Sequence, residues 1–505
     1  MGKKSGKKEA GGKDKCPVLS EDEKYKINSF KDLNSENLKG LLLYNRYAQM
    51  LILLVIAGFV LRFYNLGFNS IWLDEGTTLG YARMGFVQIW NSVMAEFHPP
   101  LFYWIEKIMM VFGENEVTLR FMPALFGVFA IPVFYILGRE IADRDAGIIS
   151  ALLVTVSPFA IYYSQDARAY TMILFLFAVS LLCYLYALKS HNMKWWVLFG
   201  ITSAIAFWAH YYTIIGTGVL VLHALFTQYK YFKTDPFFRK AFFGGIIAFI
   251  IISIPLLAVL YQRYLALSSS PPTYGVLGLP LITETLKSFS GFEWWITAIF
   301  VLMFAAGVIY LFNKNRTYSA LLVGLLFIPI IISVILSAKI TMNPRYLIFI
   351  LPAFYVGIAA CYIPMRNLIN NEKLIYVLMA LLILINIPFM AGYYTQYSKN
   401  DWRGFSQGLS SMTDSGDVVV VLPGYMRQPL DYYYSNTSDG TIEIGGYTPE
   451  DLEKINNISD NSTKYYIMTW DIMAANPDGK TVAWLEKNSE LIGQYMGIYL
   501  LKSID

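Results

Sequence analysis

The sequence predicts an all-α polytopic membrane protein of about eleven transmembrane helices, followed by a small C-terminal extracytoplasmic α/β domain. Hydrophobic residues make up 56% of the 505 residues and charged residues only 15%, whereas soluble domains have roughly 45–50% and about 25%. The apolar residues occur in blocks long enough to cross about 30 Å of hydrocarbon. Residues 393–505 instead alternate short helical and strand patterns, which is typical of an α/β domain.

The transmembrane part is predicted over residues 41–392. Each candidate span carries little or no charge along its length. These spans are 47–63, 119–138, 146–163, 170–188, 195–229, 241–262, 294–312, 318–338, 346–364 and 374–392. The stretch 195–229 is long enough for two helices with a turn near His210, which brings the total to about eleven.

The distribution of Lys and Arg predicts the orientation of these helices. Residues 1–40 contain a run of lysines, and short basic segments stay in the cytoplasm. We expect this tail to be disordered and cytoplasmic; contact with anionic lipids is the alternative role. Every second loop that follows carries at least two basic residues. An odd number of spans then places residues 393–505 outside a plasma membrane.

The C-terminal segment has recognisable elements. Residues 401–412 read as a helix, and GDVVVVLP at 416–423 as a buried strand. Thr448 is an expected N-cap, with acidic residues in the first turn of a helix over 448–456. Strands are expected at 464–470 and 496–502. Glycosylation triplets begin at Asn436, Asn457 and Asn461, which adds a little support for an outside location.

The first outer loop, residues 64–118, is too long for a plain connector. Residues 74–95 and 101–112 are predicted to form amphipathic helices on the membrane surface. Asp74 and Glu75 directly follow the exit of the first span, where a carboxylate needs a partner or a task. The alternative for Asp74 is a structural N-cap that accepts from the next backbone amides.

Other polar residues lie at the same predicted face of the membrane. His98 precedes two prolines, and is either a turn histidine or a donor to a phosphate or sugar. Asp166 and Arg168 are two residues apart, so they do not face each other on a helix and need partners, which we expect in the first outer loop. Arg345 is suited to gripping phosphate through its planar fork; a snorkelling membrane anchor is the alternative.

Five motifs occur in one order and on one predicted side of the membrane. They are WLDE at 72–75, HPPLFY at 98–103, LR at 119–120, YSQDARAY at 163–170 and PRYL at 344–347. Together they resemble the dolichyl-phosphate-mannose protein mannosyltransferase superfamily in its prokaryotic branch, which includes the aminoarabinose transferases acting on lipid A. The resemblance covers roughly residues 45–400.

The resemblance implies a GT-C fold and a polyprenyl-phosphate-linked sugar as donor. It matches Asp74 to the catalytic acidic residue of the first loop and Asp166 to the second acidic position. It places Arg345 where the family binds the carrier phosphate. The chain departs at His98, where the aminoarabinose transferases have lysine, so a lipid A substrate is not implied.

These observations predict a hexosyl- or pentosyltransferase that inverts the sugar on the non-cytoplasmic face. Asp74 and Asp166 are the expected catalytic residues, and the expected substrate-binding residues are Glu75, His98, Arg168, Tyr170, Arg345 and Tyr346. The expected acceptor is a protein, a glycan or a lipid. Membrane lipids are also expected partners, and nucleic acid is not. No cofactor is certain, but Asp74 and Asp166 are candidate ligands for a divalent cation.

Two other classes of protein remain open at this stage. A transporter or flippase would place polar residues near the middle of the membrane, whereas here the charges gather at one face. A non-catalytic scaffold would use the helices to present the C-terminal domain outside. Substitution of Asp74 separates both from an enzyme, because neither class depends on that carboxylate for catalysis.

Overall fold

The computed structural model describes residues 35–94, 98–265, 274–371, 373–434, 440–456 and 462–504. Most of the predicted tail lies outside these residues, as do the first two glycosylation triplets and Asn461 of the third. The chain divides into two units, Met1–Leu53 and Leu54–Asp505. The first contains α2 (Ser35–Tyr44) and the beginning of α3 (Arg46–Phe63). The second contains all the residues of the candidate site described below.

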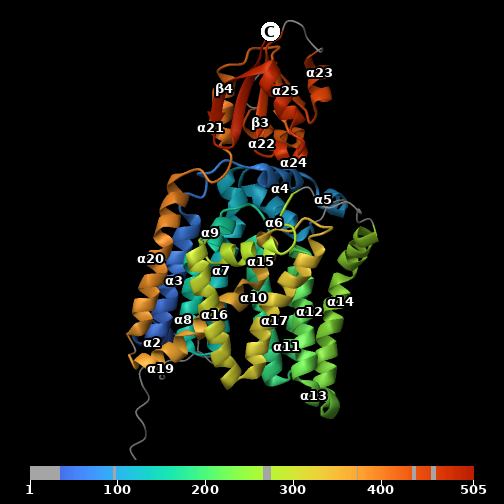
Figure 1. The fold of residues 1–505 in the computed structure, drawn as a ribbon. Coiled ribbons are helices and arrows are strands. Elements are labelled where there is room, and N and C mark those ends of the chain that lie inside the picture. The colour runs from blue at the N-terminus through green and yellow to red at the C-terminus, as the bar shows by residue number, and fades with distance from the viewer. Residues whose placement is uncertain are drawn as a thin grey trace, which may run out of the picture. The chain divides into compact units, whose positions relative to one another are not determined.

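Among the described residues, eight helical segments are long and apolar enough to cross a membrane. They are α3, α7 (Glu116–Ile141), α10 (Tyr170–Ser190), α14 (Pro236–Leu265), α16 (Trp294–Lys314), α17 (Arg316–Leu336), the run η3–α18–α19 (Pro344–Ile350, Leu351–Ala360, Tyr362–Ile369) and α20 (Leu374–Thr395). Two shorter apolar helices are α11 (Met193–Ala209) and α12 (Thr213–Thr227). With the bent pair described next, they match the predicted spans, and the polytopic helical fold is confirmed (Figure 1).

A further span is bent. Helix α8 (Arg144–Val156) and helix α9 (Pro158–Ser164) meet at an angle of 55°. Pro158 has no N–H to continue the hydrogen-bond ladder of α8. The Ser157 hydroxyl instead caps α9 by accepting from the Ala160 amide at 3.1 Å. The bend sends the chain into the short segment that carries Gln165, Asp166 and Arg168.

The helices differ greatly in how deeply they are enclosed. In the apolar 18-residue stretch of the span Pro344–Ile369, 94% is buried inside the protein, whereas in that of α20 only 17% is buried. Helix α18 can approach α16 closely because each helix has a glycine at the contact, Gly357 in α18 and Gly307 in α16. A Cβ at Gly307 would lie only 2.0 Å from the Gly357 carbonyl oxygen. Arg345 therefore stands at the end of the most enclosed span.

The first outer loop differs from the prediction in one respect. The helix expected over 74–95 is two helices, α4 (Leu73–Arg83) and α5 (Phe86–Met94). Met84 is extended, and the Gly85 amide donates to the Gln88 side chain at 2.9 Å, which starts a new helix. The expected helix over 101–112 is α6 (Leu101–Met109) continued by the 3₁₀ turn η2 (Met110–Phe112).

The C-terminal region is built around a five-stranded mixed sheet in the order β2-β1-β3-β5-β4. Its strands are β1 (Val418–Leu422), β2 (Ile442–Gly445), β3 (Lys464–Thr469), β4 (Ser489–Tyr495) and β5 (Ile498–Ser503). Strand β1 runs parallel to β2 and β3, and β5 is antiparallel to β3 and β4. The predicted α/β character is confirmed, although β2 and β4 were not expected.

Both faces of this sheet are covered. In β1, Val419 and Val421 join one apolar core and Val418, Val420 and Leu422 the other, since successive side chains alternate across a strand. The helices α21 (Trp402–Ser410) and α22 (Arg427–Tyr433) contribute to the first core, and α23 (Pro449–Asn456) and α25 (Lys480–Asn488) to the second. Thr448 caps α23 as predicted, accepting from the Asp451 amide at 3.3 Å.

The C-terminal region is hydrogen-bonded to the first outer loop. The Arg403 guanidinium donates to the Gly67 carbonyl and pairs with Glu116. The Tyr433 hydroxyl donates to Glu116 at 2.6 Å and accepts from the Ile71 amide at 2.8 Å. These contacts hold the loop near both of its ends, before α4 and at the start of α7.

Candidate active site

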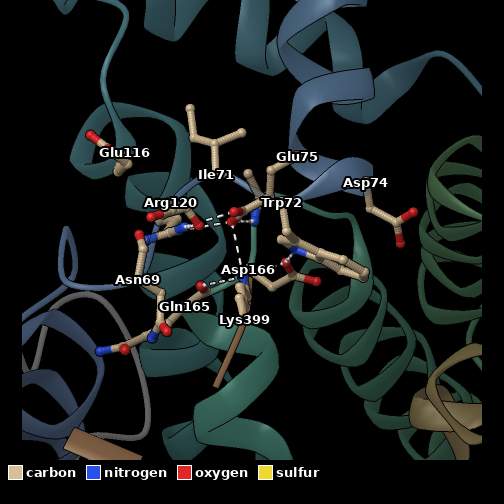
Figure 2. Close-up of polar contacts among 12 residues, drawn as sticks. Asn69, Ile71, Trp72, Asp74, Glu75, Glu116, Arg120, Gln165, Asp166 and Lys399 are labelled. Atoms are coloured by element: carbon tan, nitrogen blue, oxygen red, sulfur yellow. Dashed lines mark hydrogen bonds and ion pairs between the residues drawn. The ribbon is translucent and has the colours of Figure 1, made fainter. Parts of the chain in front are cut away.

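The first turn of α4 presents two carboxylates in different directions (Figure 2). Trp72 is the N-cap residue in an extended conformation, and no side-chain hydrogen bond caps the helix. Asp74 already lies inside the helix, so its interpretation as an N-cap is wrong. Glu75 points into the protein, whereas Asp74 points away from the residues that surround Glu75.

Glu75 belongs to a buried ion-pair cluster that also contains Arg120, Asp166 and Lys399. Arg120 grips Glu75 with two hydrogen bonds of 2.7 and 2.6 Å. The Lys399 ammonium lies 3.1 Å from Glu75 and 2.8 Å from Asp166. All four side chains are at most 2% exposed. Their two negative and two positive charges balance inside the protein.

The buried ion-pair cluster also fixes the backbone around it. The remaining donors of Arg120 reach the carbonyl oxygens of Leu66, Asn69 and Ser70 at 2.8–3.0 Å. Glu75 accepts from the Ala167 amide at 2.9 Å. The approach to α4 and the segment around Asp166 are thus locked together by one carboxylate and one guanidinium.

Opposing effects act on the pKa of Glu75. Burial alone would raise it, but the charges and hydrogen bonds of Arg120, together with the Lys399 charge, hold the pKa below its usual range. Glu75 is therefore ionised at neutral pH. Both of its oxygens are occupied by partners within the protein, although the sequence assigned it to substrate binding.

Asp166, assigned by the sequence to catalysis, is fully buried. Its Oδ1 atom accepts from the Trp72 indole and from Lys399, each at 2.8 Å. The Asp166 contact with Trp72 confirms the expectation of a partner in the first outer loop. The carboxylate holds Trp72, whose ring in turn lies 5.8 Å from the Arg345 guanidinium.

Asp74 and Arg345 form a second, more open arrangement. The Arg345 Nη2 atom lies 3.3 Å from Asp74 Oδ2, and the side chains are 18% and 22% exposed. The guanidinium also lies 5.7 Å from the Tyr170 ring centre and 5.6 Å from that of Tyr346. A paired, ring-enclosed guanidinium is unlike a snorkelling anchor, whose charged head reaches into water.

Arg168 also contacts Asp74, through the Asp74 backbone carbonyl group. It donates to the Asp74 carbonyl oxygen at 3.4 Å, to the Tyr103 hydroxyl at 3.3 Å and to His98 Nε2 at 2.8 Å. Because a guanidinium only donates, His98 Nε2 accepts and its proton is on Nδ1. Burial and the charge of Arg168 hold the pKa of His98 well below its usual value, so the ring is neutral.

A small cavity of about 20 Å³ lies beside these residues, lined in part by His98, Arg168, Tyr170 and His210. This volume suits about one water molecule. The structure therefore gathers six predicted site residues into one region: Asp74, His98, Arg168, Tyr170, Arg345 and Tyr346. Glu75 and Asp166 lie in the buried cluster next to it.

The sequence assigned no role to several residues of this region. Lys399 follows the last span directly, and a lysine next to a span on the predicted outer face, where basic residues are disfavoured, is the signal that could have identified it. Asp471, at the N-cap of α24 (Ile472–Ala475), also lies within electrostatic reach of Asp74. Burial and the Asp74 charge raise the pKa of Asp471. The C-terminal region therefore borders the site.

The candidate cation ligands fit a divalent ion poorly. Asp166 is held by Lys399, and Asp74 faces Arg345, so each carboxylate already has a positive neighbour. Within the described ranges, no group of three or more His, Cys, Asp and Glu residues is arranged to hold a metal.

Comparison with known proteins supports the resemblance seen in the sequence. Residues 97–258 match the family described as dolichyl-phosphate-mannose-protein mannosyltransferase. An uncharacterised protein of Aquifex aeolicus (strain VF5) is 29% identical over 156 residues, which are 29% of this chain and 31% of that protein. The match thus covers less than a third of that relative's length.

Solved structures show the same fold over most of the chain. ArnT from Cupriavidus metallidurans in the apo state gives a TM-score of 0.57 at 13% identity, covering 90% of this chain and 97% of ArnT. The oligosaccharyltransferase of Archaeoglobus fulgidus, in complex with Zn and sulfate, gives 0.53 at 14% identity, covering 88% and 72%. The chain is a polytopic membrane protein with the GT-C fold, and it resembles the dolichyl-phosphate-mannose-protein mannosyltransferase family.

Proposed function

We propose that this protein is a membrane glycosyltransferase that moves a hexosyl or pentosyl group from a polyprenyl-phosphate donor to a protein, glycan or lipid acceptor. The reaction takes place on the non-cytoplasmic face of the plasma membrane, with inversion of the sugar. The observation that carries the proposal is the Asp74–Arg345 pair, at 3.3 Å and partly open, with Arg168 beside it. The structure of ArnT bound to undecaprenyl phosphate supports a carrier of this class.

The chemistry needs one base and a set of cations. Asp74 takes the proton of the acceptor hydroxyl, whose oxygen attacks the anomeric carbon. The bond from that carbon to the phosphate oxygen breaks, and the polyprenyl phosphate leaves with the electron pair. Arg345 and Arg168 donate to the phosphate as its negative charge grows. A single displacement of this kind inverts the anomeric centre.

Pairing with Arg345 explains how Asp74 is kept ready without substrate. A donor phosphate competes for the guanidinium, because Arg binds phosphate through two parallel hydrogen bonds. The carboxylate loses its partner in the same step and becomes available to the acceptor. The aromatic rings of Tyr170 and Tyr346 lie beside the Arg345 guanidinium.

Glu75 and Asp166 have positioning roles in this proposal. Glu75 orients α4, and Asp166 orients Trp72 and Lys399. We propose residues 41–392 as the catalytic domain, with loop 64–118 carrying the base, and residues 393–505 as an extracytoplasmic domain that closes one side of the site. No step in this reaction is assigned to a metal ion.

The proposed function is tested with membranes that contain the protein and a panel of radiolabelled polyprenyl-phosphate sugars. Transfer of the label to an endogenous acceptor, lost on substitution of Asp74, is the expected result. A transporter would move the lipid without forming a new glycosidic bond. A scaffold would leave all donors unconsumed, and either result would refute the enzyme assignment.

Arg345→Ala is expected to weaken use of the lipid donor by about ten- to a hundredfold, because a lost charge-assisted hydrogen bond costs about 1.5–3 kcal/mol. The measurement is kcat/KM for the donor at matched protein levels. Arg316→Ala is the control, since Arg316 begins α17 and lies 5.0 Å from the Phe312 ring. Equal losses in both variants would remove Arg345 from the site.

The proposed sidedness is tested by cysteine labelling in a variant that lacks Cys16, Cys183 and Cys361. Ser438→Cys should react with a membrane-impermeant thiol reagent on intact cells, because residues 393–505 are expected outside. Lys8→Cys should react only after the membrane is opened, because a lysine-rich tail stays inside. Labelling of both positions from the same side would contradict the orientation.

A further inference from the structure

A second recess lies on the same helix as Asp74. It is a groove of about 480 Å³ between α4 and α22, the helices labelled near the junction of the membrane region and the sheet in Figure 1. Its lining includes Thr77, Gly80 and Arg83 from α4 and Gln428 and Asp431 from α22. This volume is within the range of sites that hold small molecules, about 300–1,000 Å³. We call it the α4–α22 groove.

Two glycines on one face of α4 shape the groove. At Gly76 the helices are in contact, because a Cβ there would lie 3.3 Å from Gln428 Cβ. At Gly80, one turn further on, a Cβ would meet nothing within 4 Å. Residues four apart lie on the same side of a helix. The helices therefore touch at one end and separate toward Gly80.

The polar groups of the groove are mostly uncharged hydrogen-bonding groups. The Thr77 hydroxyl lies 2.8 Å from Gln428 Oε1 and 3.1 Å from the Leu73 carbonyl oxygen, and it can donate to one of them at a time. Gln428 accepts with its oxygen, which leaves its two amide N–H groups for another partner. The Tyr432 hydroxyl donates to the Glu114 carbonyl oxygen at 2.7 Å.

The charges at the groove are balanced by neighbours. Arg83 pairs with Glu114 at 2.8 Å. Asp431 lies 3.8 Å from Arg427 and is hydrogen-bonded to Glu443, whose pKa is raised to about 7 by burial and by this contact. A phosphate or an acidic ligand would meet no unbalanced cation. An uncharged ligand rich in hydroxyl groups would meet amide, hydroxyl and carboxylate partners beside tyrosine rings.

The groove and the proposed base lie on the same helix. Thr77 follows Asp74 by three residues, which is about 4.5 Å along the helix axis, and positions three apart are neighbours on one face. A ligand in the groove could thus extend a hydroxyl toward Asp74. The walls are two helices, so they offer no strand edge for an extended peptide to pair with.

We propose that the α4–α22 groove binds a neutral glycan, which is the acceptor of the transferred sugar. This inference rests on the proposed function for its catalytic part and on the groove alone for its binding part. The sugar rings pack on the tyrosines that line the groove, Tyr81 and Tyr432. The hydroxyl groups of the sugar form hydrogen bonds with Gln428, Asp431 and Thr77. The C-terminal domain thereby supplies half of the acceptor site.

Gly80→Leu tests the groove because the new side chain fills it without a clash at Cβ, and leucine favours a helix more than glycine does. Gly218→Leu is the matched control: this glycine lies in α12, and a Cβ there also meets nothing within 4 Å. Gly80→Leu should raise KM for the glycan acceptor at least tenfold and leave KM for the lipid donor unchanged. An unchanged acceptor KM, or an equal rise in the control, would overturn the proposal.

A binding measurement separates this inference from the proposed function. The probes are labelled mannotriose, maltotriose and chitotriose, with a serine-containing hexapeptide for comparison, added to the full-length protein in detergent. At least one trisaccharide should bind wild type and the Gly218→Leu control but not Gly80→Leu, whether or not transfer is observed. Binding of the peptide alone, or of no trisaccharide, would refute a glycan site. Binding without transfer by any donor would refute only the proposed function.

Discussion

Asp74→Asn is expected to lower turnover by about 10²–10⁴-fold, the usual contribution of a positioned general base. Asparagine keeps the shape of the side chain but cannot take the acceptor proton. The structure supports this substitution as a clean test, because Asp74 caps no helix and its side chain is 22% exposed. The measurement is single-turnover transfer at saturating donor and acceptor, with donor binding measured separately.

Donor binding and thermal stability should stay close to wild type in Asp74→Asn. The matched control is Asp478→Asn, which removes the charge of an exposed aspartate paired with Lys480 at 2.9 Å. An exposed pair of this kind contributes little. Full transfer activity in Asp74→Asn would defeat its assignment as the base.

Glu75→Gln is expected to destabilise the protein by about 3–5 kcal/mol, the cost of leaving a buried charge without its partner. Arg120 and Lys399 would both face a neutral amide in a region at most 2% exposed. Yield and melting temperature in detergent are the measurements.

A matched control and a second variant make this test specific. Glu114→Gln removes one partner of an exposed ion pair with Arg83 and should change stability by less than about 1 kcal/mol. Glu75→Gln combined with Arg120→Met removes both charges and should recover part of the loss. Wild-type stability in Glu75→Gln alone would contradict the role of the buried ion-pair cluster.

Hydropathy predicts the membrane helices well because each span must satisfy its own backbone while burying apolar side chains in lipid. The same reasoning finds β1, whose run of valines is buried on both faces, but not β2, whose residues are only half-buried or exposed. The break at Met84 was missed because the apolar pattern continues across it. Only the local backbone and the Gln88 side chain interrupt the helix.

Within the site, the sequence identifies residue types but not which carboxylate is available. Asp74 and Glu75 are neighbours in the chain, and nothing in the pattern tells which of them meets Arg120. That depends on the rotation of α4, which is fixed by the contacts that Glu75 makes with Arg120, Ala167 and Lys399. Such distant partners are set by tertiary packing, so a single sequence without them cannot assign the two roles.

The position of Lys399 also has a consequence for synthesis. It is 233 residues from Asp166 in the chain, and it follows the last membrane helix. Until that part of the chain leaves the ribosome, Glu75 and Asp166 have only one of their two cations, and the net charge of the cluster is negative. The cluster then reaches neutrality only after all the spans have been made, because loop closure over so long a distance comes late. The charge balance of the cluster thus depends on synthesis of the last membrane helix and of the residues that directly follow it.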